Sequence, residues 1–276
     1  MNKEILLLVL SALAGILGTG IGGMIGAFVK NKNKASVGDM LTFAAGVMLG
    51  VVAFEMVPEA VANCIVSGKK FFGALIVIAC VMAGVGVTYL VNFAVDKASA
   101  KRQNMPLECR KNHDSGVKIS NVETLEAKRN FGLKRAGIVT LLAIALHNVP
   151  EGMAIGASGA SNAYAGVVVA LVIALHNVPE GMAISAPLVS GGVKASRAVV
   201  LSVLAGLSTL AGALVGVFVG CMGDLASSVS VSLASGAMIY VSVFDLLPVG
   251  SALKNKFAAF AFFSGIVLAM ILTLLI

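Results

Sequence analysis

The chain of 276 residues is 58% hydrophobic and only 12% charged, with a mean hydropathy of +0.98 and a formal net charge of +7. Soluble domains carry roughly 25% charged residues, so this composition excludes an ordinary soluble enzyme or binding domain. The apolar residues fall in runs long enough for the ~20-residue helix that crosses a bilayer. We predict an all-α membrane protein, a single polytopic membrane domain over residues 1–276, with eight transmembrane helices at about 4–29, 38–63, 71–95, 135–158, 163–188, 197–222, 226–250 and 255–276.

The basic residues are concentrated in alternate connections between these spans. If the N-terminus is outside, all but three of the 20 basic residues fall in inner loops, the exceptions being Lys3, Lys69 and Lys70. Because Lys and Arg favour the cytoplasmic side, both termini are expected outside. The net charge therefore reflects membrane topology. We predict that the partner of the chain is the lipid bilayer and that it binds no nucleic acid. The compact loops indicate a multi-pass protein of a prokaryotic inner (cell) membrane.

The first apolar run continues through Val29, longer than the apolar part of a signal peptide, and is expected to be a span. Span two ends with Glu55 and Glu59, one helical turn apart near its outer end. Asp245 lies near the inner end of span seven. We predict the two glutamates as candidate entrance ligands for a cation and the aspartate as a candidate exit ligand; charge at solvated helix ends is the alternative.

Spans two and seven resemble each other. The stretches "AGVMLGVVAFEMVPE" (Ala45–Glu59) and "SGAMIYVSVFDLLPV" (Ser235–Val249) share glycine, methionine, valine, phenylalanine and proline positions, and Glu55 falls opposite Asp245. The two spans run in opposite directions. This pattern predicts inverted repeats, spans one to three and six to eight, around central spans four and five, which is a transporter architecture with a site near the midplane.

The one long connection, residues 97–134, is polar and separates the first three spans from the last five. We predict that it is a cytoplasmic loop. Cys109, His113 and Asp114 within it form a weak candidate for transient metal contact. Cys64 and Cys221 both lie near outer helix ends, and the sequence leaves open whether they form a disulfide or are simply buried.

A motif is repeated in the two central spans: "ALHNVPEGMAI" occurs at Ala145–Ile155 and again at Ala174–Ile184. On a helix, residues four apart share one face, and the next residue lies about 100° around. Each motif therefore presents a histidine, an asparagine and a glutamate on one side of its helix. These residues are His147, Asn148 and Glu151 in span four, and His176, Asn177 and Glu180 in span five.

A short loop near 158–163 makes these two helices antiparallel, which is expected to bring His147 towards Glu180 and Glu151 towards His176. Two imidazoles and two carboxylates suit zinc, and they also admit iron, manganese or cobalt. Hydrogen-bonded contact between the helices is the alternative. Because ionisable groups inside a membrane usually mark ion paths, we favour a transported divalent metal, Zn²⁺ first, with Fe²⁺, Mn²⁺, Co²⁺ and Cd²⁺ as further candidates.

The paired "HNVPEG" motif resembles the signature of the ZIP family of divalent metal transporters, in particular its bacterial-type members. The eight spans, the external termini and the long loop after span three match as well. The resemblance implies a secondary transporter that moves zinc and related ions into the cytosol through an elevator-like movement of a transport bundle. It also implies a primary site of His147, Glu151, His176 and Glu180, and an adjacent second site that uses Asn148, Asn177 and the two glutamates as bridges.

One position departs from the family pattern. Many ZIP proteins carry a further glutamate in span six, within a sequence like "GLAEPLGA", whereas the matching stretch here is "GLSTLAGA" (Gly206–Ala213), with Thr209 at that position. An uncharged hydroxyl is a weaker ligand for a divalent cation than a carboxylate. We therefore predict one tightly bound ion at a time.

Other functions are less well supported by the sequence. Neither a Walker motif nor a phosphorylated-aspartate segment is present, which argues against coupling to ATP within the chain. A metal-dependent intramembrane hydrolase would need a general base beside the metal ligands, and HExxH is absent. We predict no enzyme activity and no resident cofactor. A gated metal channel of the same fold stays open as the alternative, as do a monomer and a homodimer.

Overall fold

The computed structural model describes residues 3–28, 34–64, 70–103, 121–161, 163–219, 223–253 and 256–274. Apart from short turns, these residues are helical. In chain order the elements are α1 (Lys3–Phe28), α2 (Lys34–Val51), the π-helical turn η1 (Val52–Met56), α3 (Val57–Cys64), α4 (Lys70–Gln103), α5 (Asn121–Ser161), α6 (Ala163–Ser190), α7 (Ala195–Val219), α8 (Gly223–Tyr240), the π-helical turn η4 (Val241–Leu246), α9 (Leu247–Ala252) and α10 (Ala258–Thr273).

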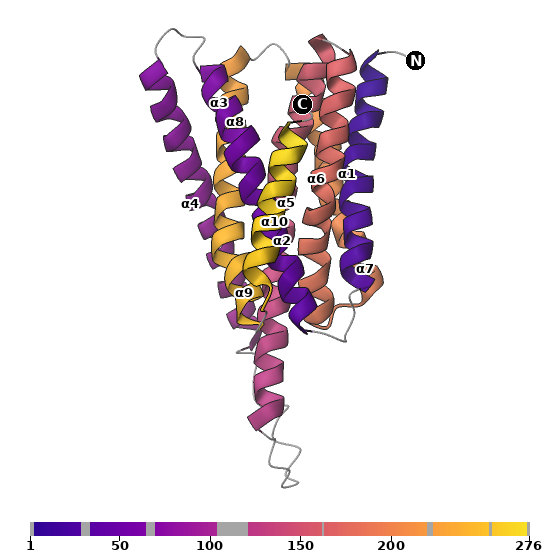
Figure 1. Ribbon diagram of the computed structural model, residues 1–276, viewed down its shortest axis with the longest axis vertical. Helices are drawn as coiled ribbons and strands as arrows, with labels where there is room; N and C mark the ends of the chain where they lie inside the picture. The colour runs from indigo at the N-terminus through magenta and orange to yellow at the C-terminus, as the bar shows by residue number, and fades with distance from the viewer. Residues whose placement is uncertain are drawn as a thin grey trace.

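The helices confirm the predicted all-α membrane fold. Seven helical stretches within the described residues are long and apolar enough to cross a membrane, and the eighth predicted span corresponds to α10, a shorter apolar helix. Figure 1 shows that the start of α1 and the end of α10 lie at the same, upper end of the bundle, whereas α5 begins at the lower end. An even number of crossings places the two ends on one side in this way.

The connection between spans three and four is more helical than predicted. Within 97–134, α4 continues to Gln103 and α5 begins at Asn121, so only the middle of the predicted loop lies between helices. The sequence from 121 to 134 is rich in leucine, alanine, glutamate, lysine and arginine, which are strong helix formers without needing burial. Figure 1 shows the first turns of α5 extending below the other helices.

Four residues of the cysteine and loop predictions lie outside the described part of the chain. The buried Cys64 lies within it, with its Sγ 2.9 Å from the hydroxyl oxygen of Ser228. That hydroxyl in turn donates to the carbonyl of Ala60. The residues outside the description are Cys109, His113, Asp114 and Cys221.

The helices form two bundles. In the first, which we call the motif bundle, α1 packs mainly on α6, α7 packs on α5, and α1 also contacts α7. In the second, the flanking bundle, α10 packs on α2 and α4 packs on α8, with η1, α3, η4 and α9 completing it. Figure 1 shows the two groups, with α1, α6 and α7 on the right and α3, α4 and α8 on the left. The bundles meet where α2 packs on α6 and α8 packs on α5.

The packing confirms the inverted repeat. Exchanging α1 with α7, α2 with α8, α4 with α10 and α5 with α6 converts each of these contacts into another that is present. Close glycine contacts follow the same relation. A Cβ built on Gly22 of α1 would lie 1.9 Å from the carbonyl oxygen of Val178, and one on Gly212 of α7 would lie 1.9 Å from that of Val149. Glycine at these positions permits backbone-to-backbone contact between helices in lipid.

The same relation holds in the flanking bundle. A Cβ on Gly84 of α4 would lie 2.1 Å from the carbonyl oxygen of Leu233, and one on Gly265 of α10 would lie 2.3 Å from that of Phe43. Leu233 and Phe43 occupy matching positions in the repeated spans seven and two. The two glycine contacts therefore show which residues of α4 and α10 are equivalent in the repeat: residue 84 of α4 corresponds to residue 265 of α10.

The two π-helical turns occupy equivalent positions in spans two and seven. In each, the N–H that closes the turn donates to a carbonyl five residues earlier. Pro58 and Pro248 are the second residues after the turns, and a proline ring would clash with the carbonyl four residues before it in a regular α-helix. A widened turn relieves that clash. Each turn carries an acidic residue, Glu55 in η1 and Asp245 in η4.

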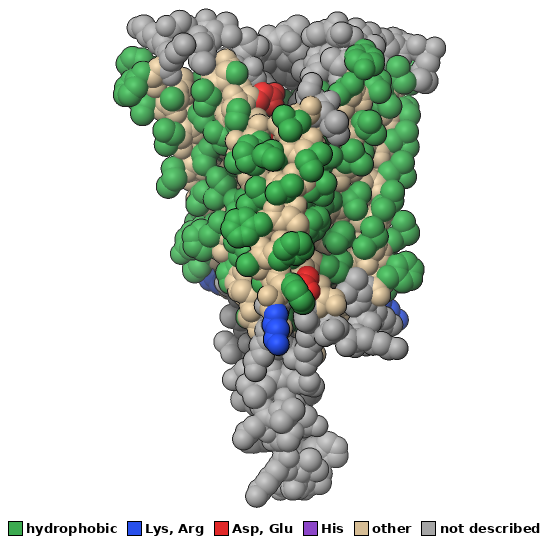
Figure 2. Space-filling model, in the orientation of Figure 1, with side chains coloured by type: hydrophobic (Ala, Val, Ile, Leu, Met, Phe, Trp, Pro, Cys, Tyr) green, Lys and Arg blue, Asp and Glu red, His purple; other side chains and the backbone are tan. Residues whose placement is uncertain are grey.

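The surface suits a bilayer. Exposed leucine, isoleucine, valine and phenylalanine side chains cover the middle of the molecule (Figure 2). In α4, only 17% of the apolar stretch that is long enough to cross a membrane is buried. The blue lysine and arginine side chains visible in Figure 2 lie at the lower end. The described basic residues with exposed side chains are Lys97, Lys134, Lys194, Arg197 and Lys256.

Candidate metal site

The two motif helices bring their histidines and glutamates together as the sequence predicts. The Nε2 of His176 lies 2.8 Å from Oε1 of Glu151, and the Nε2 of His147 lies 3.4 Å from Oε1 of Glu180. Within α5, the Nε2 of His147 is also 2.6 Å from Oε1 of Glu151. Glu151 therefore contacts both imidazoles. All four side chains are buried, and Glu151, at 8% exposure, is the most accessible.

The spacing of these atoms fits a small divalent cation. One ligand atom from each of His147, Glu151 and His176 can be chosen so that all lie within 4.8 Å of one another. Ligands at about 2.1 Å from a tetrahedral zinc ion are separated by roughly 3.4 Å. The pair between His147 and Glu180 already has this separation, and the two shorter pairs would move apart by less than about 1 Å to admit the ion.

The asparagines occupy equivalent places beside this cluster. The Nδ2 of Asn148 donates to the carbonyl of Ala205 on α7 at 3.2 Å, and that of Asn177 donates to the carbonyl of Ala14 on α1 at 3.5 Å. Both side chains are fully buried, and their Oδ1 atoms have no hydrogen-bond partner among the described residues. Each amide thus anchors a motif helix through its nitrogen and keeps its oxygen available for a cation.

Thr209 lies beside the cluster, on the helix that packs against Glu151. A Cβ built on Gly152, the next residue along α5, would lie 1.9 Å from the carbonyl oxygen of Thr209. The threonine is fully buried, and its hydroxyl oxygen has no hydrogen-bond partner within the described ranges. A carboxylate at this position would place a third acidic group next to the site, and the threonine supplies none.

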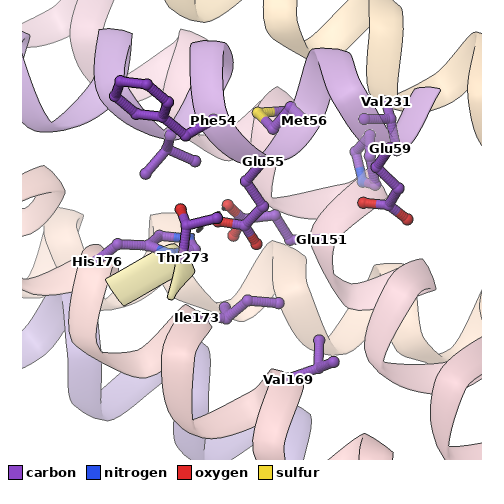
Figure 3. Close-up of a pocket in the computed structure, with 12 residues that line it drawn as sticks. Phe54, Glu55, Met56, Glu59, Glu151, Val169, Ile173, His176, Val231 and Thr273 are labelled. Carbon is purple, nitrogen blue, oxygen red and sulfur yellow. Dashed lines mark hydrogen bonds and ion pairs between the residues drawn. The ribbon is translucent and has the colours of Figure 1, made fainter. Parts of the chain in front are cut away.

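A cavity of about 430 Å³ leads to one side of the cluster (Figure 3). Two of its polar lining residues, Glu151 and His176, belong to the site, and two others are the predicted entrance residues Glu55 and Glu59. Glu59 is exposed, Glu55 is half-buried and Glu151 is buried, so the three carboxylates become less accessible towards the site. In Figure 3 the side chain of Glu55 extends from η1 towards Glu151. Thr273 also lines the cavity and was not predicted as a site residue.

Asp245 is not among the residues that line this cavity. It is buried, at 3% exposure, and its carboxylate lies near the side chains of Asn92 and Arg135. Neither residue was predicted to contribute to a site. Asn92 could have been singled out as a polar residue inside an apolar span, whereas Arg135 reads from the sequence only as one of many basic residues at an inner helix end.

A His–Glu cluster that could hold a metal ion is therefore buried between two antiparallel spans of a multi-pass helical membrane protein. Comparison with known proteins identifies the family. The model of the family described as ZIP Zinc transporter matches residues 5–273, so the chain belongs to this family, which consists of transporters rather than enzymes. The resemblance read from the paired motif is confirmed.

Curated relatives match over nearly the whole chain. The zinc transporter ZupT of Clostridium perfringens is 33% identical over 279 residues, which covers 100% of this chain and 97% of the relative. That of Streptococcus mutans is 33% identical over 270 residues, which cover 97% of this chain and 96% of the relative. That of Chlorobium luteolum is 37% identical over 253 residues, which cover 87% of this chain and 86% of the relative.

Proposed function

We propose that the protein is a secondary transporter that carries zinc across a bacterial inner membrane into the cytosol. The observation that carries this proposal is the buried cluster of His147, Glu151, His176 and Glu180, held within 2.6–3.4 Å contacts inside the membrane-spanning helices. Burying four ionisable groups in a membrane is costly, and such groups usually mark the path of an ion or a substrate. Membership of the ZIP family and the name of the relatives support zinc as that ion.

The proposed direction rests on charge. The basic residues whose side chains are described as exposed lie at the end of the molecule opposite the start of α1 and the end of α10, which supports a cytoplasmic 97–134 segment and external termini. The cavity with Glu55 and Glu59 then opens outward. Moving a doubly charged ion inward is favoured by about 2.3 kcal/mol per charge for each 100 mV of membrane potential.

Transport through the site is tested by uptake of zinc-65 into proteoliposomes that carry an inside-negative potential. A carrier predicts uptake that saturates with zinc concentration and that unlabelled zinc inhibits. Competition by Fe²⁺, Mn²⁺, Co²⁺ and Cd²⁺ then ranks the other candidate substrates. Uptake that rises linearly with concentration would favour the gated channel instead. Protein-free liposomes are the control, and equal uptake by both would contradict the proposal.

Glu55 is proposed as an entrance ligand between the exposed Glu59 and the buried Glu151. Replacing Glu55 by glutamine keeps its shape and removes one negative charge from the cavity wall. We expect the KM for zinc to rise about fivefold, as loss of about 1 kcal/mol of attraction implies, with little change in maximal rate. Concentration-dependent uptake measures this. Asp39→Asn, on α2 and away from the cavity lining, is the matched control, and equal KM values for the two variants would contradict the role.

Thr209 supports the proposal that a single zinc ion is bound tightly at a time. Equilibrium dialysis of the purified protein against zinc-65 is expected to give one tight ion per chain, because Thr209 adds no third carboxylate beside Glu151 and Glu180. Asn148 and Asn177 would contribute only weakly through neutral oxygens. Two ions of equal affinity per chain would show that the hydroxyl and the amides form a full second site.

A further inference from the structure

Four polar side chains from four different elements form a network at the boundary between the bundles. The Nδ2 of Asn92 on α4 donates to the hydroxyl of Tyr240 on α8 at 2.9 Å and lies 3.4 Å from Oδ1 of Asp245 in η4. Arg135 on α5 donates through Nη2 to Oδ1 of Asn92, and its Nη1 lies 4.0 Å from Oδ1 of Asp245. Arg135 is the member from the motif bundle, and the other three belong to the flanking bundle.

The inverted repeat gives this network a position on the ion path. Asp245 in η4 is the counterpart of Glu55 in η1, and the alignment of α4 with α10 makes Asn92 the counterpart of Thr273. Glu55 and Thr273 both line the outer cavity. Asp245 and Asn92 therefore occupy the matching places on the inner half of the protein, where both are buried.

In the described part of the chain, the inner counterparts of two residues that line the outer cavity are fully buried. Val169 and Ile173 of α6 line the outer cavity, and their counterparts on α5 are Thr140 and Ile144. Both counterparts have 0% exposure, and the hydroxyl of Thr140 has no hydrogen-bond partner in the described part of the chain. If the two bundles shifted relative to each other, these counterparts would line an inner cavity that the inverted repeat relates to the outer one.

We propose that Arg135 is the gating residue that keeps this inner half closed. Its guanidinium lies beside the Asp245 carboxylate, where a departing zinc ion would bind, and its positive charge repels a divalent ion from that place. Arg135 is carried on α5 with the zinc ligands His147 and Glu151, so movement of the motif bundle would remove it from Asp245 and Asn92 and expose the carboxylate to the ion. This inference rests on the proposed zinc transport.

The location of Arg135 agrees with this role. Its side chain is 28% exposed while that of Asp245 is 4% exposed, so the arginine is the more solvent-accessible member of the pair. The positive charge also repels a cation that approaches from the cytosol while the network is intact.

The test measures thiol accessibility at equivalent inner and outer positions. One variant carries Thr140→Cys and another carries Val169→Cys. A membrane-impermeant maleimide is applied in the absence of zinc, to inside-out vesicles for position 140 and to right-side-out vesicles for position 169. Peptide mass spectrometry then reads position 140 or 169 alone, so the native cysteines do not interfere. In the parent variants we expect rapid labelling at 169 and slow labelling at 140.

Adding Arg135→Ala is expected to accelerate labelling at 140 by about tenfold or more, the effect of losing one charged hydrogen bond between the bundles, and to slow labelling at 169. Lys134→Ala, which removes an exposed positive charge one residue away, is the matched control and should change neither rate. Unchanged labelling at 140, or acceleration at both positions as general loosening would give, would overturn the gate. A wild type that fails to take up zinc would instead overturn the proposed function, because labelling requires no zinc.

Discussion

Replacing Glu151 by glutamine is expected to abolish tight zinc binding. Its Oε1 lies 2.6 Å from Nε2 of His147 and 2.8 Å from Nε2 of His176, so this carboxylate contacts both imidazoles. Loss of a residue that merely supports a metal ligand weakens affinity 10–100-fold, and loss of a charged direct ligand should therefore weaken it by at least about 100-fold. Equilibrium dialysis of the detergent-solubilised protein against zinc-65 measures the change.

The matched control for Glu151→Gln is Asp39→Asn, which also exchanges a carboxylate for an amide on a membrane helix. Asp39 lies near the start of α2, and it does not line the cavity that leads to the site. Its replacement should leave zinc affinity unchanged. Equal zinc affinity for Glu151→Gln and the wild type would show that the buried glutamate only holds α5 and α6 together.

Replacing Gly152 by alanine is expected to destabilise the protein and to weaken zinc binding as well. A Cβ at this position would lie 1.9 Å from the carbonyl oxygen of Thr209, which belongs to the backbone of α7 and cannot rotate away. Overpacking of this kind costs about 1–3 kcal/mol. Because Gly152 follows Glu151 directly, the separation of α5 from α7 would also displace the carboxylate. Thermal denaturation in detergent, followed by size-exclusion chromatography, measures the stability.

Gly86→Ala on α4 provides the control for this variant. A Cβ on Gly86 meets no atom within 4 Å, so the methyl group is accommodated and the helix gains the preference of alanine over glycine, about 1 kcal/mol. The two variants make the same chemical change in membrane helices. Equal melting temperatures would mean that the close contact between α5 and α7 is not needed for stability.

The sequence predicts those features that depend on residues near each other in the chain. Runs of apolar residues locate the spans, and the helical spacing of His147 and Glu151 places them on one face. The pairing across helices, with Glu151 next to His176, follows once the short connection makes the two helices antiparallel. The match between Glu55 and Asp245 identifies the inverted repeat, which the structure bears out in the packing of the glycines.

Other features require the three-dimensional arrangement. The network of Asn92, Arg135 and Asp245 joins helices far apart in the sequence, and a basic residue at the end of a span gives no signal of such contacts. Near-symmetric repeats also leave undetermined which half of the protein is open, because Glu55 and Asp245 have similar sequence surroundings. Only the packed bundles place a cavity beside Glu55 and close the region around Asp245.

The most direct test of the transport site compares zinc-65 uptake by the wild type and by the double variant His147→Ala/Glu180→Ala in proteoliposomes. These residues form a contact between the two motif helices, at 3.4 Å, and the double change removes one ligand from each helix. We expect saturable uptake by the wild type and uptake at the level of protein-free liposomes by the variant, provided that both elute as folded protein. Uptake by the folded variant at the wild-type rate would contradict the assignment of this cluster as the transport site.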